Sequence, residues 1–309
     1  MAGTRHYPDL FNSSKDRGTE PVEHFSDLSN PPRLKTGDLI ADRFVVVDIL
    51  HLSDGRVGEA DVYYCTDKRT RKAVALKNYR MQMQPHREIL EKLRQVDHPD
   101  LVRIFAFGSW RDSFYEAMEF CQGGTLTNYL PLNEQDLRRL LPPVNNGLNY
   151  LHSQGIVHRD IKPSNILFRK QAMEGLVLSD FGCSSFLSSI ETDGRTAELP
   201  KITIDYTPPE YLFDRLISNK YDYYSLGITL IHAVTGQSPF AGYDYRSIMG
   251  SLHKGPISPP ASLSPSFQLL IKGLIQHEPG RRWGYSQVRQ WLAGETVLTD
   301  TGLPWVIEL

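Results

Sequence analysis

Two short polar motifs within apolar flanks constrain the fold of this chain more than any other feature. The first, HRDIKPSN, runs from His158 to Asn165, and fifteen residues later Asp180 opens the second motif, DFG. Asp160 is suited to accept the proton of an attacking hydroxyl, while Asn165 and Asp180 carry oxygen ligands for Mg²⁺. Both motifs occur in order and at this spacing, so they predict phosphoryl transfer rather than two unrelated polar loops.

Five further motifs lie on either side of the first two. In chain order they are VALK ending at Lys77, MEFC at 118–121, PPE ending at Glu210, YDYYSLG around Asp222 and PGRR ending at Arg282. The whole series, over roughly residues 43 to 293, resembles the eukaryotic-type Ser/Thr protein kinase family (Hanks-type). The resemblance implies an α+β fold of two lobes, with a small β-rich lobe that carries one main helix and a large helical lobe.

The resemblance gives each motif a role. Lys77 would grip the α- and β-phosphates of ATP, and backbone groups of the hinge at 118–121 would bond the adenine. Glu210, which closes the activation segment, would pair with Arg282, and Asp222 would steady the catalytic loop. ATP and Mg²⁺ are therefore the expected cofactors.

These expectations define a set of site residues. Catalysis is assigned to Asp160, Lys162, Asn165 and Thr203, and metal binding to Asn165 and Asp180. The nucleotide is expected to contact Gly55, Val57, Val62, Ala75, Lys77, Met118, Glu119, Cys121 and Leu167, with Glu88 as a tentative addition.

Two of these residues indicate the acceptor. Lys162, two residues after Asp160, resembles the Ser/Thr-kinase form of the catalytic loop, in which the lysine stabilises the transferring phosphoryl group. Thr203 lies seven residues before Glu210, where the family's substrate-facing threonine bonds the catalytic aspartate and lysine. Both favour a Ser or Thr hydroxyl of a protein substrate, and a homodimer that autophosphorylates is one possible assembly.

Composition excludes several other classes of protein. The 309 residues are 40% hydrophobic, enough for a large core, and the net charge of −2 gives no basis for a nucleic-acid surface. No run approaches the roughly 18 apolar residues of a membrane span. Three scattered cysteines form no disulfide framework or zinc pattern. We therefore expect a reduced, cytoplasmic protein with no nucleic-acid partner and no membrane span.

The domain boundaries follow from the change in composition along the chain. A polar extension is expected at 1–36, a kinase domain at 37–294 and a tail at 295–309, with lobes at about 43–120 and 124–294. β-Branched and aromatic runs predict strands at 44–47, 62–65, 73–77, 101–108 and 114–119 around a helix at 87–96. Helical patterns follow at 137–152, 222–235, 266–276 and 287–292.

The phosphate loop departs from the family pattern. If Val62 is the valine of the G-x-G-x-x-G-x-V loop, the glycine positions fall on Gly55, Val57 and Ala60. The β-branched Val57 disfavours positive φ and crowds a phosphate. The GEADVY sequence at residues 58–63 resembles the corresponding loop of prokaryotic kinase-like proteins. The alternative to an enzyme is thus a pseudokinase scaffold or binding module with an impaired phosphate loop. Against this alternative, the chain keeps the four polar residues that pseudokinases usually lack in part, namely Lys77, Asp160, Asn165 and Asp180.

The carboxylate partner of Lys77 is a second departure. In the family, the main helix of the small lobe presents a glutamate to this lysine. Here the candidates are Glu88 and Glu91, yet the apolar residues of the helix point roughly 140–160° away from both on a helical wheel. Three outcomes stay open: a pair with Glu88, a pair with Glu91, or no pair.

Activation is open in the same way. Arg159 resembles the arginine that captures an activation-loop phosphate, but it could instead pair with a carboxylate, which would give activity without phosphorylation. The candidate phosphosites are Ser184, Ser185, Ser188, Ser189, Thr192 and Thr196. The candidate carboxylates are Glu191, Asp193 and Glu198.

Overall fold

The first part of the molecule is a six-stranded antiparallel sheet. The computed structural model describes residues 33–51, 60–79, 85–189 and 202–305. The strand order is β1-β2-β3-β4-β6-β5, so β4 and β6 are neighbours although the main helix and β5 separate them in the chain. The strands are β1 (Leu39–Ile40), β2 (Phe44–His51), β3 (Ala60–Asp67), β4 (Ala73–Tyr79), β5 (Ile104–Trp110) and β6 (Ser113–Glu119).

Alternation along the strands gives this sheet two apolar faces. On β4, Val74 and Leu76 belong to one core cluster, whereas Ala75 and Tyr79 belong to a larger one. Helix α1 (Arg87–Arg94) packs on that second face and contacts β5. Its buried side chains are Ile89, Leu90 and Leu93. These are the inward residues expected from the helical period, so the prediction of one main helix on the sheet is confirmed.

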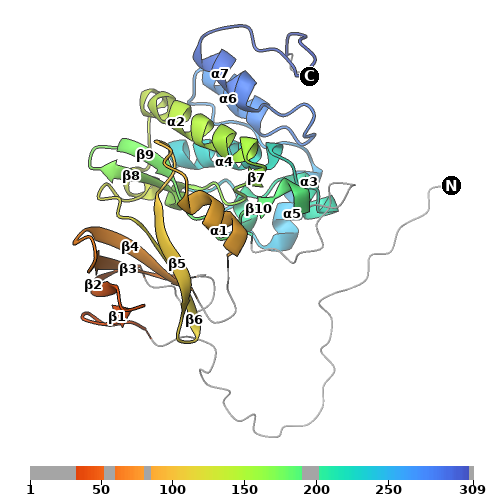
Figure 1. Ribbon diagram of the computed structural model, residues 1–309. Helices are drawn as coiled ribbons and strands as arrows, with labels where there is room; N and C mark the ends of the chain where they lie inside the picture. The colour runs from red at the N-terminus through yellow and green to blue at the C-terminus, as the bar shows by residue number, and fades with distance from the viewer. Residues whose placement is uncertain (1–32, 52–59, 80–84, 190–201, 306–309) are drawn as a thin grey trace, which may run out of the picture.

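The second part of the molecule is helical (Figure 1). Its helices are α2 (Glu134–Ser153), α3 (Pro209–Asp214), α4 (Lys220–Thr235), α5 (Tyr245–His253), α6 (Pro265–Leu274) and α7 (Tyr285–Leu292). Four short strands lie between α2 and α3, β7 (Ile156–Val157) pairing with β10 (Ser185–Phe186) and β8 (Ile166–Lys170) pairing with β9 (Glu174–Leu178). A sheet with one helix followed by a helical region is the predicted two-lobed kinase fold.

One continuous core joins the two parts. The cluster that holds Ala75 and Met118 of the sheet also holds Leu148 of α2, Phe181 and the buried side of α4. The chain after Gly294 packs against the helical part, because the Trp305 indole donates to the Arg281 carbonyl and its ring meets that of Trp283. In the described part of the chain, no helix combines the length and apolar character needed to cross a membrane.

Candidate active site

The first motif forms a loop between β7 and β8 whose polar groups converge on Asp160. Asn165 donates from its amide nitrogen to the backbone oxygen of Asp160 (2.8 Å) and to its Oδ2 (2.7 Å). Lys162 Nζ lies 2.8 Å from Oδ2, and Thr203 Oγ1 donates to Oδ1 at 2.7 Å. Asp160 is only 5% exposed, so these bonds compensate for the burial of its charge.

Thr203 and Lys162 are also bonded to each other. Lys162 Nζ donates to Thr203 Oγ1 at 2.7 Å, which closes a ring of three residues with Asp160. Burial lowers the pKa of Lys162, but the charge and hydrogen bond of Asp160 outweigh it, so the net shift is upward. The ammonium therefore keeps its charge beside the place where an acceptor hydroxyl would lie. The residues expected to touch the acceptor are brought together.

The buried carboxylate of Asp222, near the start of α4, anchors the backbone of the same catalytic loop. Asp222 accepts the backbone N–H of His158 (2.9 Å) and of Arg159 (2.8 Å), and it contacts His152 Nε2 at 2.7 Å. Burial raises the pKa of Asp222, but the bond to His152 and the other donors outweigh it and leave the pKa lowered. Arg159 has φ of +67°, a conformation that costs about 1–3 kcal/mol outside glycine and that these bonds help to hold.

The second motif brings Asp180 against the sheet. Lys77 Nζ lies 2.5 Å from Asp180 Oδ1, and the Gly182 N–H also approaches that oxygen (3.3 Å). Burial raises the pKa of Asp180, but the charge and hydrogen bond of Lys77, helped by Lys162, outweigh it and leave the pKa lowered. Lys77 and Asp180 thus meet between the two parts of the molecule, a contact that the motifs did not predict.

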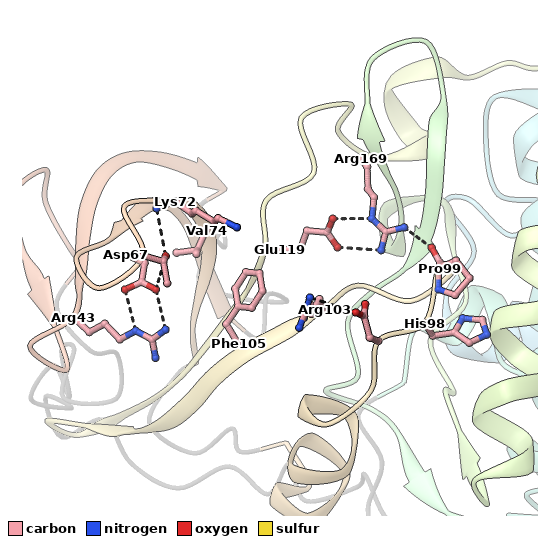
Figure 2. Close-up of a pocket in the computed structure, with 12 residues that line it drawn as sticks. Arg43, Asp67, Lys72, Val74, His98, Pro99, Arg103, Phe105, Glu119 and Arg169 are labelled. Carbon is pink, nitrogen blue, oxygen red and sulfur yellow. Dashed lines mark hydrogen bonds and ion pairs between the residues drawn. The ribbon is translucent and has the colours of Figure 1, made fainter.

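The hinge residue Glu119 ties the sheet to the helical part. Its carboxylate receives two bonds from Arg169 of β8, from Nε at 2.7 Å and from Nη2 at 3.2 Å. Arg169 also bonds the carbonyls of Pro99 and Leu101, as Figure 2 shows for Pro99. The side chain of Glu119 therefore braces the hinge, and only its backbone is left to serve a nucleotide.

The residues in Figure 2 line a pocket of about 580 Å³ that is separate from the catalytic groups. Its lining includes two ion pairs, Arg43 with Asp67 on one side and Arg169 with Glu119 on the other. Neither Asp160 nor Lys77 lines it. The pocket therefore lies next to the hinge residue Glu119 and is not part of the candidate phosphate site.

The other expected nucleotide contacts come from both parts. Ala75 and Met118 are opposite each other on β4 and β6, and both are buried. Val62 pairs with Lys77 across β3 and β4, and Leu167 lies on β8. Burial raises the pKa of the Cys121 thiol to about 12, so this thiol is protonated at neutral pH. Gly55 and Val57 lie outside the described residues.

The structure does not bring Glu88 to Lys77. Glu88 is exposed on α1, and the Glu91 carboxylate pairs with Arg94 instead, at 2.5 Å. Among the described residues neither glutamate forms an ion pair with Lys77. The cause is the one that the helical wheel implies: Ile89, Leu90 and Leu93 turn toward the sheet, which directs both carboxylates away from it.

The sequence interpretation missed a buried carboxylate close to Lys77. Glu116 of β6 is opposite Lys77 of β4 in the antiparallel register, and its exposed fraction is 0%. The signal was present: Glu116 alternates with Phe114 and Met118, so it is a charge at an inward position of an apolar strand.

The closing motif of the activation segment is bonded as the resemblance implies. Arg282 donates to both oxygens of Glu210, at 2.6 and 2.8 Å, and both residues are buried. Arg282 also bonds the carbonyls of Lys220 and Gln276. This bidentate pair fixes the end of the segment to the helix bundle.

Arg159 has a partner that was not expected. Its guanidinium donates to the Tyr211 hydroxyl (3.1 Å) and lies over that ring. Ser184 and Ser185 are buried, and Ser184 bonds the His158 carbonyl. Those two serines are therefore inaccessible as phosphosites in this conformation. The candidate phosphosites Thr192 and Thr196 and the three candidate carboxylates of the activation segment lie outside the described residues.

Comparison with known proteins agrees with the fold. A family model of the protein kinase domain matches residues 50–292, so the chain belongs to the protein kinase domain family.

Similar proteins include kinases of animals and of a bacterium. The chain is 33% identical over 254 residues to mouse mitogen-activated protein kinase kinase kinase 4, an alignment that covers 77% of this chain and 16% of that protein. It is 27% identical over 310 residues to Xenopus laevis serine/threonine-protein kinase stk11, covering 90% and 70%. It is 31% identical over 223 residues to Bacillus subtilis serine/threonine-protein kinase PrkC, covering 69% and 33%. The chain thus spans about one sixth of the first relative.

Proposed function

We propose that this chain is an active Ser/Thr protein kinase that transfers the γ-phosphoryl group of Mg-ATP to a Ser or Thr hydroxyl of a protein. The observation that carries the proposal is the closed ring of hydrogen bonds among Asp160, Lys162 and Thr203. The ionised Oδ1 of Asp160 accepts only the bond from Thr203, so it keeps a lone pair to which an acceptor hydroxyl can still bind. The kinase domain of this proposal spans 37–294, between an extension at 1–36 and a tail at 295–309.

The residues present fit a magnesium ion. Asn165 turns its amide nitrogen to Asp160, so its amide oxygen, which accepts only a long bond from the Ser164 hydroxyl (3.4 Å), keeps a lone pair for a metal, and Asp180 offers a carboxylate. Two hard oxygen donors with space for phosphate oxygens and water suit Mg²⁺ better than a softer metal. These two residues would hold the ion, which when bound offsets the charge of the phosphates.

The chain's own groups divide the remaining work. Asp160 orients the acceptor hydroxyl and takes its proton. Thr203 and Lys162 hold Asp160 in one rotamer, and the Lys162 ammonium stabilises negative charge on the phosphoryl oxygens. Lys77 anchors the nucleotide on the side of the sheet.

The competing proposal is a pseudokinase scaffold that binds a partner without catalysis. The observation in its favour is that neither glutamate of α1 reaches Lys77. A scaffold does not require Asp160, Lys162 and Thr203 to be bonded in one ring, so we favour the enzyme.

A phosphate-transfer assay separates the two proposals. The chain is incubated with γ-labelled Mg-ATP and a basic acceptor protein, beside Asp160→Asn, which keeps the size of the side chain but not its charge. We expect label on Ser or Thr from the wild type and a loss of about 10²–10⁴-fold in the variant. Equal labelling by both proteins, or none by either, would reject the enzyme. Dependence of self-labelling on protein concentration would report action of one copy on another.

A further inference from the structure

A buried carboxylate faces Lys77 from the neighbouring strand. Lys77 and Glu116 are opposite residues of β4 and β6, and opposite side chains of an antiparallel pair lie on the same face of the sheet. That face is the one on which α1 packs, since Tyr79 and Phe114, the next residues on the same face, belong to the core cluster of α1. Glu116 therefore occupies the space between the sheet and α1.

The environment of Glu116 is costly for a purely structural residue. Its exposed fraction is 0%. Tyr79 donates to Oε2 at 2.8 Å, but Oε1 is buried and has no hydrogen-bond partner among the described residues. A buried, half-satisfied carboxylate destabilises a fold relative to an apolar residue. Such a group is retained most readily where its charge is used.

The charge that Glu116 meets is that of Lys77. Burial raises the pKa of Glu116, and the positive charge of Lys77, which favours the ionised carboxylate, offsets only part of this rise. The negative charge of Asp180 raises it further. Lys77, Glu116 and Asp180 thus form one electrostatic group of an ammonium and two carboxylates, one from the sheet and one from the DFG motif.

We propose that Glu116 is the positioning residue for Lys77, in place of a glutamate from α1; this inference rests on the proposed function. In the described structure Lys77 is paired with Asp180. Asp180 is also a metal ligand of the proposed function, so a bound cation competes for its carboxylate. Glu116 then remains on β6 to hold the ammonium toward the nucleotide, and its open oxygen Oε1 is the acceptor that can do so.

Three matched substitutions test this inference. Glu116→Gln removes the charge while preserving size and the bond from Tyr79. Glu88→Gln tests the rival glutamate of α1, and Glu91→Gln, whose carboxylate pairs with Arg94, is the control. For each full-length variant, Mg-ATP affinity is measured by calorimetry, melting temperature without nucleotide is recorded, and KM for ATP and kcat are determined separately.

We expect Glu116→Gln to weaken Mg-ATP binding and raise KM for ATP, each about tenfold, because one charge interaction with a partly buried lysine is lost. Its melting temperature should stay at or above that of the wild type, because the substitution removes a buried charge. Glu88→Gln and Glu91→Gln should stay within about twofold of wild type in affinity, as exposed charges contribute little.

Opposite results would overturn the inference. A loss in Glu88→Gln with normal affinity in Glu116→Gln would return the role to α1, and a lowered melting temperature that accounts for the lost affinity would leave Glu116 a structural residue. If Glu116→Gln weakens Mg-ATP binding as expected but the wild type transfers no phosphate, the proposed function alone is rejected. Transfer that is normal in Glu116→Gln would reject the inference alone, and a wild type that binds no Mg-ATP would reject both.

Discussion

The two sides of the candidate active site differ in how completely their polar groups are bonded. On the helical side, Asp160 is held through both oxygens and its loop is fastened to Asp222 by two backbone bonds. On the sheet side, Lys77 is paired with a prospective metal ligand, and one oxygen of Glu116 has no partner among the described residues. The groups on the helical side are thus bonded to one another, whereas under the proposed function the charges on the sheet side would exchange partners when a nucleotide binds.

The largest effect should come from breaking the nucleotide side at Asp180. Asp180→Ala removes a metal ligand and the close partner of Lys77, so kcat should fall on the order of 10³-fold or more, as when a main electrostatic group of a transition state is lost. The fold should persist, because among the described residues the Asp180 side chain accepts, besides the contact with Lys77, only the bond from the Gly182 N–H. Steady-state kinetics with circular dichroism checks both points, and wild-type kcat in this variant would remove the mechanism.

The next effect is on stability and belongs to the helical side. Arg282→Leu leaves the buried Glu210 carboxylate without its bidentate partner, and breaking a buried pair in this way costs about 3–5 kcal/mol. The control is Arg94→Leu, which breaks the exposed pair with Glu91 and should cost at most about 1 kcal/mol. Urea unfolding of both variants measures the difference, and equal costs would show that the Glu210–Arg282 pair does not anchor the segment.

A smaller effect on activity should follow from opening the ring around Asp160. Thr203→Ala deletes one bond to Asp160 and one from Lys162, and the loss of charge-assisted bonds predicts a fall in kcat of about 10- to 100-fold. Thr203→Ser keeps the hydroxyl and should recover most of the activity, with KM for ATP unchanged in both. If KM for ATP rises instead, Thr203 acts on the nucleotide side and the division into two sides is wrong.

The smallest effect is the acid dependence of stability. The bond and charge of Arg43 hold the pKa of Asp67 below its ordinary value, and the His152 bond and other donors outweigh burial to do the same for Asp222. A carboxyl whose pKa is lower in the folded state contributes stability above its unfolded pKa, near 4, and that stability is lost as the pH falls through and below this value. Denaturant unfolding from pH 7 to pH 3 should show the decline.

A single substitution measures how much of this loss of stability at low pH comes from Asp67. Asp67→Asn should make the pH profile flatter while leaving phosphate transfer at neutral pH within about twofold, because Asp67 lies away from the catalytic groups. A profile as steep as that of the wild type would show that Asp67 contributes nothing to it.

The sequence predicted the helical side better than the sheet side, for a physical reason. Asp160, Lys162 and Asn165 lie within six residues, so local chain geometry brings them together once the loop is anchored. Thr203 was placed there by the family resemblance alone. The buried carboxylate opposite Lys77 is set by strand register, which places Glu116 across from it although the two residues are 39 positions apart, and a helical wheel ranks only residues of one helix.

Tertiary packing explains the other misses. Tyr211, the partner of Arg159, comes from α3 and lies 52 residues further along the chain, so no local pattern links them. Helix α5 was not predicted because it buries only Ile248 and Leu252, too few apolar residues for a clear helical period. The long α4, which is buried along most of its length, was identified from its motif and its apolar run.

The most direct test of the two-sided account measures Mg-ATP affinity and phosphate transfer side by side in Asp160→Asn and Lys77→Ala. The account predicts that Asp160→Asn binds Mg-ATP within about threefold of wild type yet loses transfer by about 10²-fold or more, because its lost charge serves the acceptor. Lys77→Ala should lose both nucleotide affinity and transfer. An Asp160→Asn protein that loses Mg-ATP affinity as severely as Lys77→Ala, or that transfers phosphate at the wild-type rate, would contradict the account.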